Sequence, residues 1–336
     1  MKAFISRRDF LKAAGVTAAA AALAGCSSSS GSASGSAAGG KTIKIGVFEP
    51  ASGDNGAGGK QEVLAIEYAN SIAPTVDIGG ETYNVELVEV DNQSSTDKAV
   101  TAAQELVSKK VSIVLGSYGS GCSIAAAPTF QAASIPAIGC SSTNPPVTEA
   151  NPYYFRVCFL DPFQGSVMAS FAKDQFGASN AYVLSMLGED YGSGLATYFV
   201  NAFEALGGTV TNEQFPEGTS DFSAYIQNAI NAGADVIFAP CATTYAAQII
   251  TQAASAGFDK PITAGDTWES SVILDAQKGT NVQVYCSTFF DENDDSGIAK
   301  EFVTGFKEWL NADSQKLTNN GGNDIVAAVS ALGVDG

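Results

Sequence analysis

Histidine is absent from the 336-residue chain, and arginine is scarce. Without histidine the chain has no Ser-His or Cys-His catalytic pair and no His-ligated metal site. Two of the three arginines stand at positions 7 and 8, so Arg156 is the only one in the rest of the chain. A bidentate arginine clamp for a phosphate or a dicarboxylate is therefore not expected.

The six cysteines lack the Cys-x-x-Cys spacing of most metal and redox motifs. Cys26 belongs to an N-terminal segment described below, and the five that remain leave at least one free thiol if the others pair. A Cys241–Cys286 disulfide is conceivable because both residues follow apolar, strand-like runs, but the sequence does not settle the pairing. We expect no metal and no cofactor.

The chain also has fewer basic than acidic residues. The formal net charge at pH 7 is −18, and the basic residues near the N-terminus leave the remainder more negative still. Such a surface repels nucleic acid and anionic lipid, so neither is expected as a partner. Solubility outside the cell accounts for this charge.

The first 26 residues have the layout of a cleaved export signal. Ser6-Arg-Arg-Asp-Phe-Leu-Lys12 gives a basic start, an alanine-rich run follows, and Leu23-Ala-Gly-Cys26 closes the segment. The apolar run is shorter than the roughly 20 residues that span a bilayer. The segment resembles a twin-arginine signal that ends in a lipobox. It predicts a mature chain anchored to the outer face of the cell membrane by lipidated Cys26.

Residues 27–41 are almost all serine, glycine and alanine. Such a composition has nothing to bury and forms a flexible coil. We interpret this segment as a tether between the lipid and a folded body.

The body alternates short apolar runs with amphipathic segments. In its first part, strands are expected at 43–48, 83–90, 111–115 and 135–139, with helices at 60–71, 96–109 and 123–133. Helices at 163–176, 191–206, 223–232 and 245–256 then alternate with strands at 181–186, 209–215, 236–239, 261–264 and 282–289. This order predicts an α/β fold of two doubly wound, parallel-sheet lobes with ligands at the carboxyl ends of the strands.

The two lobes are expected to be joined by a hinge. We assign residues 42–159 and 291–336 to the first lobe and residues 160–290 to the second, with the hinge near 159–162 and 287–291. The chain stops inside a segment that reads as a first-lobe helix, 323–332. Its C-terminal end is therefore interpreted as truncated.

Small, polar loops follow the expected strands in both lobes. Gly116-Ser-Tyr-Gly-Ser-Gly-Cys-Ser123 and Gly139-Cys-Ser-Ser-Thr143 are rich in hydroxyls. Backbone N–H groups at a helix start, with hydroxyls such as those of Ser120 and Ser123, can hold a carboxylate without arginine. The alternative is ordinary turn formation, with Ser123 as a helix N-cap.

Other site motifs are missing. The loop 53–61 lacks the glycine and the Ser/Thr of a phosphate-binding loop, and no Gly-x-Gly-x-x-Gly or Gly-x-Ser-x-Gly is found. The acidic run 291–295 lacks the spacing and closing glutamate of a calcium loop, so a solvated turn is expected there.

Several segments together are similar to a known family. They are 45–53, 116–123, 135–143, 156–165, Asp190-Tyr-Gly-x-Gly194 and Gly265-Asp266. In this order and spacing, and with the lipobox, they resemble the branched-chain amino-acid family of ABC-transporter solute-binding proteins, which have the type I periplasmic binding protein fold. The resemblance implies a clamshell that closes on a free amino acid.

The resemblance also implies ligand-binding positions. Ser120 and Thr143 match side chains that bind the ligand carboxylate, and the Ser141 carbonyl helps to accept the ammonium. Tyr191 matches a tyrosine that lines the second lobe, and Asp266 stands where the family carries an acid for the ammonium. An N-cap role for Asp266, at a helix beginning near Trp268, remains the alternative.

Two parts of the ligand site depart from the family pattern. Thr243 falls near a ligand-facing position, but the loop around it differs in length. Gly58 replaces an aromatic residue that is common in the first loop, and Tyr118 stands beside the carboxylate site. Which amino acid or small amide is bound does not follow from the sequence.

The sequence thus predicts a monomeric, non-enzymatic receptor that captures a free branched-chain or other neutral amino acid and delivers it to the permease subunits of an ABC importer. Two other functions stay open. One is a sensory module that reports ligand occupancy to a signalling partner. The other is a secreted α/β enzyme acting on a small amide, in which Asp190 and Asp266 would be the candidate acids.

Overall fold

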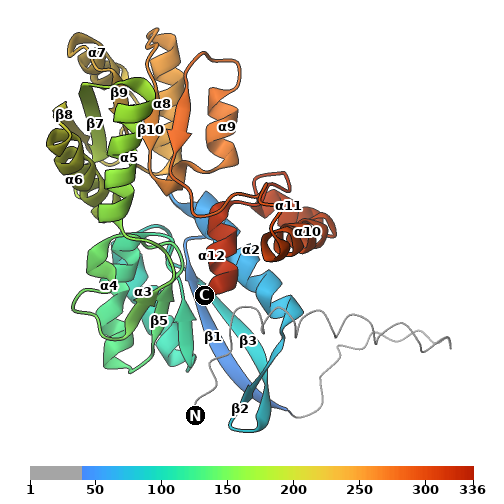
Figure 1. Cartoon of the computed structure of the whole chain (residues 1–336). Helices are drawn as coiled ribbons and strands as arrows, with labels where there is room; N and C mark the ends of the chain where they lie inside the picture. Colours follow the sequence, from blue (N-terminus) through green and yellow to red (C-terminus); the bar gives the residue numbers. More distant parts are fainter. Residues whose placement is uncertain (1–39) are drawn as a thin grey trace.

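The computed structural model of the chain describes residues 40–336 (Figure 1). The predicted signal, the lipidated Cys26 and nearly all of the predicted tether lie outside the described residues. Within the described part, no helix is both long and apolar enough to cross a membrane. The chain there forms two α/β lobes, each around its own mainly parallel sheet (Figure 1).

Six strands form the first sheet, in the order β2-β3-β1-β4-β5-β6. Neighbouring strands are parallel except β2 and β3, an antiparallel hairpin that the sequence analysis missed. The hairpin turns at Gly79-Gly80, where both residues have the positive φ that glycine tolerates best. The strands are β1 (Lys41–Glu49), β2 (Thr75–Ile78), β3 (Glu81–Asp91), β4 (Ile113–Leu115), β5 (Ala137–Gly139) and β6 (Tyr154–Arg156).

Helices pack on both faces of this sheet because successive strand side chains point to opposite sides. Phe48 and Val114 face α3 and α4, whereas Val47 and Leu115 face α2 and α12. The helical elements that precede the second lobe are α2 (Gly56–Ile72), α3 (Thr96–Ser108), α4 (Ser120–Ala132) and the short 3₁₀ helix η1 (Pro145–Val147).

Five parallel strands form the second sheet, in the order β11-β10-β9-β7-β8. They are β7 (Asn180–Met186), β8 (Thr209–Phe215), β9 (Val236–Phe238), β10 (Ile262–Ala264) and β11 (Val284–Cys286). The helices of this lobe are α5 (Asp161–Phe176), α6 (Asp190–Ala205), α7 (Ser223–Asn231), α8 (Thr243–Ser255), the 3₁₀ helix η2 (Asp266–Trp268) and α9 (Ser271–Gln277). One buried cluster joins the sheet to α5 and α6, and another joins it to α7 and α8.

The conceivable Cys241–Cys286 disulfide does not form, and all five cysteines of the described part are free. The sheet order explains why. Cys286 ends β11 and Cys241 follows β9, with β10 between these strands. Two strand spacings are about 9–10 Å, which exceeds the Cα separation that a disulfide can bridge.

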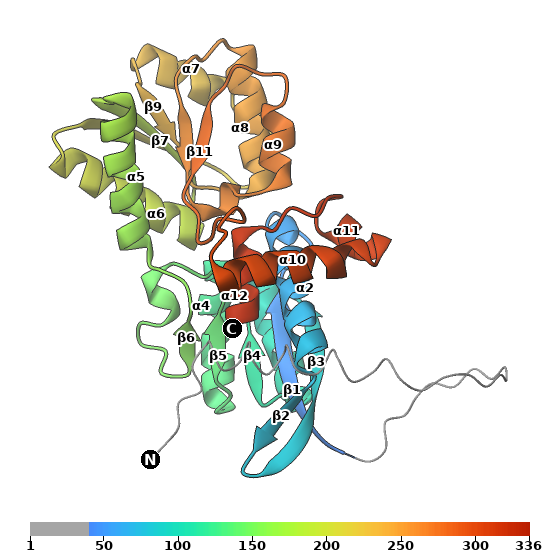
Figure 2. The ribbon, with the colours of Figure 1, turned by 45° about the vertical axis from the view of Figure 1, so that its right-hand side comes forward.

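After the second lobe the chain returns to the first as α10 (Gly297–Asn311), α11 (Ser314–Asn319) and α12 (Ala328–Asp335) (Figure 2). The predicted helix over 323–332 is wrong at its start, because residues 323–327 are not helical. Side chains replace helical hydrogen bonds there: Asn323 accepts from Ile325 N, and Glu292 accepts from Val326 N. Helix α12 then packs closely on α2, where Gly333 meets Ala65.

Two connections between the lobes lie side by side. Phe159 comes just before α5 and Phe289 comes just after β11, and their ring centroids are 4.3 Å apart. This places one apolar contact at the segments where a hinge is expected.

Candidate functional site

The seven residues predicted to bind a ligand all follow a strand or begin a helix, and all are buried. First-lobe positions come after β4 and β5, and second-lobe positions come at the starts of α6, α8 and η2. The residues are Tyr118, Ser120, Ser141, Thr143, Tyr191, Thr243 and Asp266.

Asp266 lies at the centre of the second-lobe part of the site. Its Oδ1 accepts hydrogen bonds from Gln164 Nε2 at 2.9 Å and from the Tyr191 hydroxyl at 3.0 Å. Burial raises the pKa of Asp266 to about 6, although these two hydrogen bonds favour the charged form. Both partners are uncharged, so the carboxylate lacks a compensating cation among the described residues.

The alternative role of Asp266 as a helix N-cap is wrong. Its side chain makes no capping hydrogen bond, and Gly265 precedes the 3₁₀ helix that Asp266 begins. The next α-helix begins at Ser271 and is capped by Ser270, whose hydroxyl accepts from Val272 N. The carboxylate of Asp266 therefore does not cap a helix, and its hydrogen bonds go to Gln164 and Tyr191.

Two first-lobe hydroxyls have no hydrogen-bond partner. Ser141 Oγ and Thr143 Oγ1 are both buried and unpaired. Ser120 Oγ accepts only a long bond, 3.4 Å, from Asn144 N. Ser141 lies beside the Glu62 carboxyl and Thr143 lies beside the Asp161 carboxyl, so both hydroxyls are hydrogen-bond donors held at this end of the sheet.

Ser123 does not take part, either as an N-cap or as an anion ligand. Helix α4 begins three residues earlier than expected, at Ser120, with Gly119 before it. Ser123 Oγ accepts from Ser117 N and lies 2.8 Å from Ser142 Oγ. These contacts hold the two hydroxyl-rich loops against each other.

Arg156 holds a loop and does not reach the ligand site. Its Nη1 donates to Ser142 O at 2.7 Å, and its Nη2 donates to Asn144 O at 2.9 Å and to Thr148 Oγ1 at 2.9 Å. The guanidinium thereby fixes the loop that carries Thr143.

Tyr118 occupies the space that Gly58 leaves open. A Cβ atom added at Gly58 would lie only 2.8 Å from the Tyr118 hydroxyl and would also collide with the ring. Tyr118 N donates to Glu49 Oε2 at 2.6 Å, which fixes the start of the tyrosine loop. The aromatic wall at this position thus comes from the loop after β4 and not from α2.

Hydrogen bonds join the two lobes around the site. Asp54, in the loop before α2, accepts from the Tyr245 hydroxyl at 2.8 Å and from Thr244 Oγ1 at 3.2 Å, both in α8. On the other side, Asn144 Nδ2 donates to Asp190 O at 2.6 Å. Thr243 is next to Thr244 in the chain and so lies near this contact. Its own side chain makes no hydrogen bond to the described residues.

Four polar residues near the site were not among the predicted ligand residues. Asp161 begins α5 beside Thr143, and burial raises its pKa to about 8. Gln164 joins Asp266 to Ser287, whose hydroxyl donates to Gln164 Oε1 at 2.8 Å. Glu49 lies close to Tyr118, and Glu62 lies close to Ser141. A polar residue directly after an apolar strand was a signal for Glu49, whereas nothing in the sequence pattern distinguished Glu62.

Comparison with known proteins identifies the family. A model described as periplasmic binding protein matches residues 42–332, and a model of the twin-arginine translocation signal matches residues 5–24. The Leu/Ile/Val-binding protein homolog 1 of Brucella abortus is 27% identical over 274 residues, covering 79% of this chain and 71% of that protein.

Solved structures agree with this assignment. The leucine-binding protein LivK of Thermotoga maritima is 33% identical, with a TM-score of 0.79 over 88% of this chain and 80% of that one. The substrate-binding protein LivJ of Streptococcus pneumoniae, solved with isoleucine, is 27% identical, with a TM-score of 0.73 over 87% and 88%. A Rhodopseudomonas palustris protein solved with 4-hydroxybenzoate shares the fold at 22% identity, with a TM-score of 0.74 over 88% and 78%. The chain belongs to the periplasmic binding protein family, with the two-lobed type I fold of the leucine-binding proteins.

Proposed function

We propose that this protein is the extracytoplasmic substrate-binding component of an ABC importer and that it captures a free amino acid. The observation that carries the proposal is the division of polar groups between the lobes. Unpaired hydroxyls of Ser141 and Thr143 lie on the first lobe, and the carboxylate of Asp266 lies on the second. A zwitterion complements this arrangement, because its carboxylate accepts hydrogen bonds from hydroxyls and its ammonium donates to an acid.

The chemistry of the site favours an amino acid over an aromatic acid. A benzoate carries a carboxylate but no cation, and it would bring a second negative charge close to Asp266. Arg156, the only described arginine, already donates to its own loop. Leu/Ile/Val-binding relatives and the isoleucine complex support the same ligand class.

Calorimetry on the intact chain tests this function. We expect at least one amino acid to bind, while benzoate and 4-hydroxybenzoate do not. Thr143→Ala should weaken amino-acid binding by about 1.5–3 kcal/mol, the range for a hydrogen bond to a charged group. Binding of benzoate without any binding of amino acids would overturn the proposal.

Capture would occur by hinge closure. Residues 42–159 and 291–336 would form one rigid lobe and residues 160–290 the other, and ligand contacts to both lobes would stabilise the closed form. The bound state would then be presented to permease subunits in the membrane. The protein would act as a monomer, and the same closure could serve a sensory module.

An enzymatic role has less support. Asp266 is bonded to Gln164 and Tyr191, and Asp190 contributes a backbone carbonyl to the contact between the lobes. Neither carboxyl is hydrogen-bonded to a serine, threonine or cysteine side chain among the described residues, so no activated side-chain nucleophile is seen beside either acid. Absence of turnover on small amides that bind would agree with the receptor function.

We also propose that lipidated Cys26 anchors the protein to the membrane. The matched twin-arginine signal ends two residues before this cysteine. In Cys26→Ser, we expect the protein to leave the membrane fraction and appear in the soluble extracytoplasmic fraction. Fractionation followed by immunoblotting measures this, with Cys158→Ser as the matched control. Wild-type membrane retention of Cys26→Ser would contradict lipid anchoring.

A further inference from the structure

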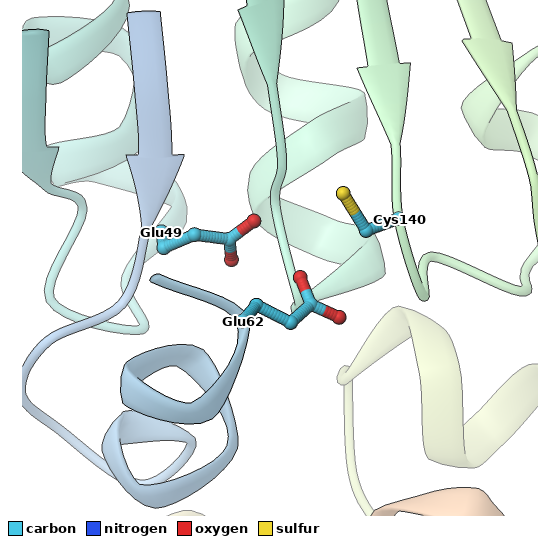
Figure 3. A group of neighbouring side chains, drawn as sticks. All are labelled: Glu49, Glu62 and Cys140. Carbon is cyan, nitrogen blue, oxygen red and sulfur yellow. The ribbon is translucent and has the colours of Figure 1, made fainter. Parts of the chain in front are cut away.

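Glu49, Glu62 and Cys140 meet at the carboxyl edge of the first sheet. Glu49 ends β1, Glu62 lies in α2, and Cys140 directly follows β5. Figure 3 shows the three side chains pointing into one shared space, and their ligand atoms all lie within 4.8 Å of one another. The exposed fractions are 1% for Glu49, 0% for Glu62 and 0% for Cys140.

The two carboxyl groups are poorly satisfied. Glu49 Oε2 accepts from Tyr118 N, but no N–H group of the described residues donates to Glu49 Oε1 or to either carboxyl oxygen of Glu62, and the two carboxyl groups lie beside each other and beside the Ser141 hydroxyl. No lysine or arginine of the described residues forms an ion pair with either acid. Buried carboxylates without hydrogen bonds or a cation are costly, so the pair requires a proton or a positively charged partner.

A third side chain connects this pair to the candidate ligand site. Ser141 is only 3% exposed, and its hydroxyl is unpaired. It lies close enough to Glu62 to favour the charged form of that carboxyl. Tyr118, on the other side, is close enough to Glu62 and to Asp266 for both charges to act on its hydroxyl. Ser141 and Tyr118, two of the residues that we propose for the amino-acid site, thus lie close to the acidic pair.

Three free acceptor oxygens match one particular donor group. An alkylammonium has three N–H donors and no acceptor, and it also supplies the missing positive charge. We propose that Glu49 and Glu62 bind a second ammonium group of the ligand, which is therefore an amino acid with an amine-bearing side chain. This rests on the proposed capture of a free amino acid, with Asp266 reserved for the α-ammonium.

Titration calorimetry with the full chain at pH 8 tests the inference. The probes are lysine, ornithine and 2,4-diaminobutyrate, with leucine and norleucine as neutral partners of similar size. We expect the best diamino acid to bind at least tenfold more tightly than either neutral amino acid. Glu62→Gln and Glu49→Gln should reduce this preference at least tenfold, while Glu301→Gln, the same change on the exposed face of α10, should preserve it.

Each contrary result has a distinct meaning. Leucine binding as tightly as the best diamino acid would overturn the inference and leave the proposed function standing. Failure of every amino acid to bind would overturn both. If Zn²⁺ or Mn²⁺ alone raises the melting temperature, and Cys140→Ala abolishes this rise, the cluster is a metal site and the inference is wrong. The comparison of wild-type affinities decides the matter even if a variant does not fold.

Discussion

Asp266 is a buried acid whose direct partners, Gln164 and Tyr191, carry no charge. In the closed cleft a ligand ammonium would pair with it. Asp266→Asn keeps the shape but removes the charge, which leaves the ligand cation buried and unpaired. Breaking such a pair costs on the order of 3–5 kcal/mol, or about two to four decades in affinity.

Calorimetry of Asp266→Asn with the identified ligand measures this loss, and the melting temperature should not fall. Asp259→Asn, an exposed acid of the same lobe, is the matched control. Undiminished affinity in Asp266→Asn would show that the ammonium binds elsewhere.

Protonation of Glu62 should make the free energy of unfolding depend on pH. Burial raises the pKa of Glu62 to about 7, above the ordinary value of 4.5. Between these two pH values the folded chain holds a proton that the unfolded chain has released. The free energy of unfolding of the ligand-free protein should therefore fall as pH rises from about 5 to 8. The groups close to Glu62 are Glu49, Cys140, Ser141, Tyr118 and Asp266, and none is a cation.

Chemical denaturation at pH 5, 6, 7 and 8 measures this dependence. Glu62→Gln should flatten it by on the order of 1–3 kcal/mol across the range. Glu301→Gln, which removes one exposed charge, should leave the slope nearly unchanged. An identical slope in Glu62→Gln and wild type would mean that Glu62 is ionised throughout.

The sequence analysis located the hydroxyl-rich loops but gave Glu49 and Glu62 no role. Ser141 and Thr143 could be selected because small polar residues directly after a strand lie at the ligand edge of such folds. Glu62 lies inside a helix, where an acid ordinarily faces water. Only the packing of α2 against the ends of β1 and β5 turns it toward Glu49.

At the scale of elements, the loop before α2 and the start of α8 form a contact across the cleft. Asp54 accepts from Tyr245 and Thr244 there. Asp54→Ala removes both bonds in the closed form and should cost about 0.5–1.5 kcal/mol per lost bond. Ligand affinity should fall by roughly 5- to 150-fold, mainly through faster dissociation.

Stopped-flow dissociation kinetics test this contact. Asp259→Ala in the second lobe is the control, because its side chain lies on the surface away from the first lobe's loops. Unchanged dissociation from Asp54→Ala would mean that this contact contributes nothing to closure.

Most helices and strands followed from periodicity, but β2, β6, α10 and α11 were not predicted. The β2–β3 hairpin was missed because β2 is exposed along its whole length and carries no burial pattern. Residues 323–332 have helical composition, yet Glu292 and Asn323 accept the backbone N–H groups of the first part. A side chain from a distant element cannot be anticipated from a local pattern.

For the whole molecule, closure should be visible in solution. Phe159 and Phe289 contact each other where we expect the hinge, and rotation there would separate Asp266 from the first-lobe hydroxyls in the ligand-free protein. Small-angle scattering should give a smaller radius of gyration when saturating amino acid is added. Asp266→Asn at the same ligand concentration should stay expanded. A wild-type profile that does not change would contradict hinge closure.

Tyr118 and Gly58 constrain how this pocket can change during evolution. Any side chain at position 58 would overlap the Tyr118 ring. A mutation that enlarges residue 58 is therefore accepted only after Tyr118 has become small. The reverse order passes through a misfolded or occluded intermediate. Positions 58 and 118 therefore cannot both carry large side chains in this backbone, and a substitution at one of them limits what the other accepts.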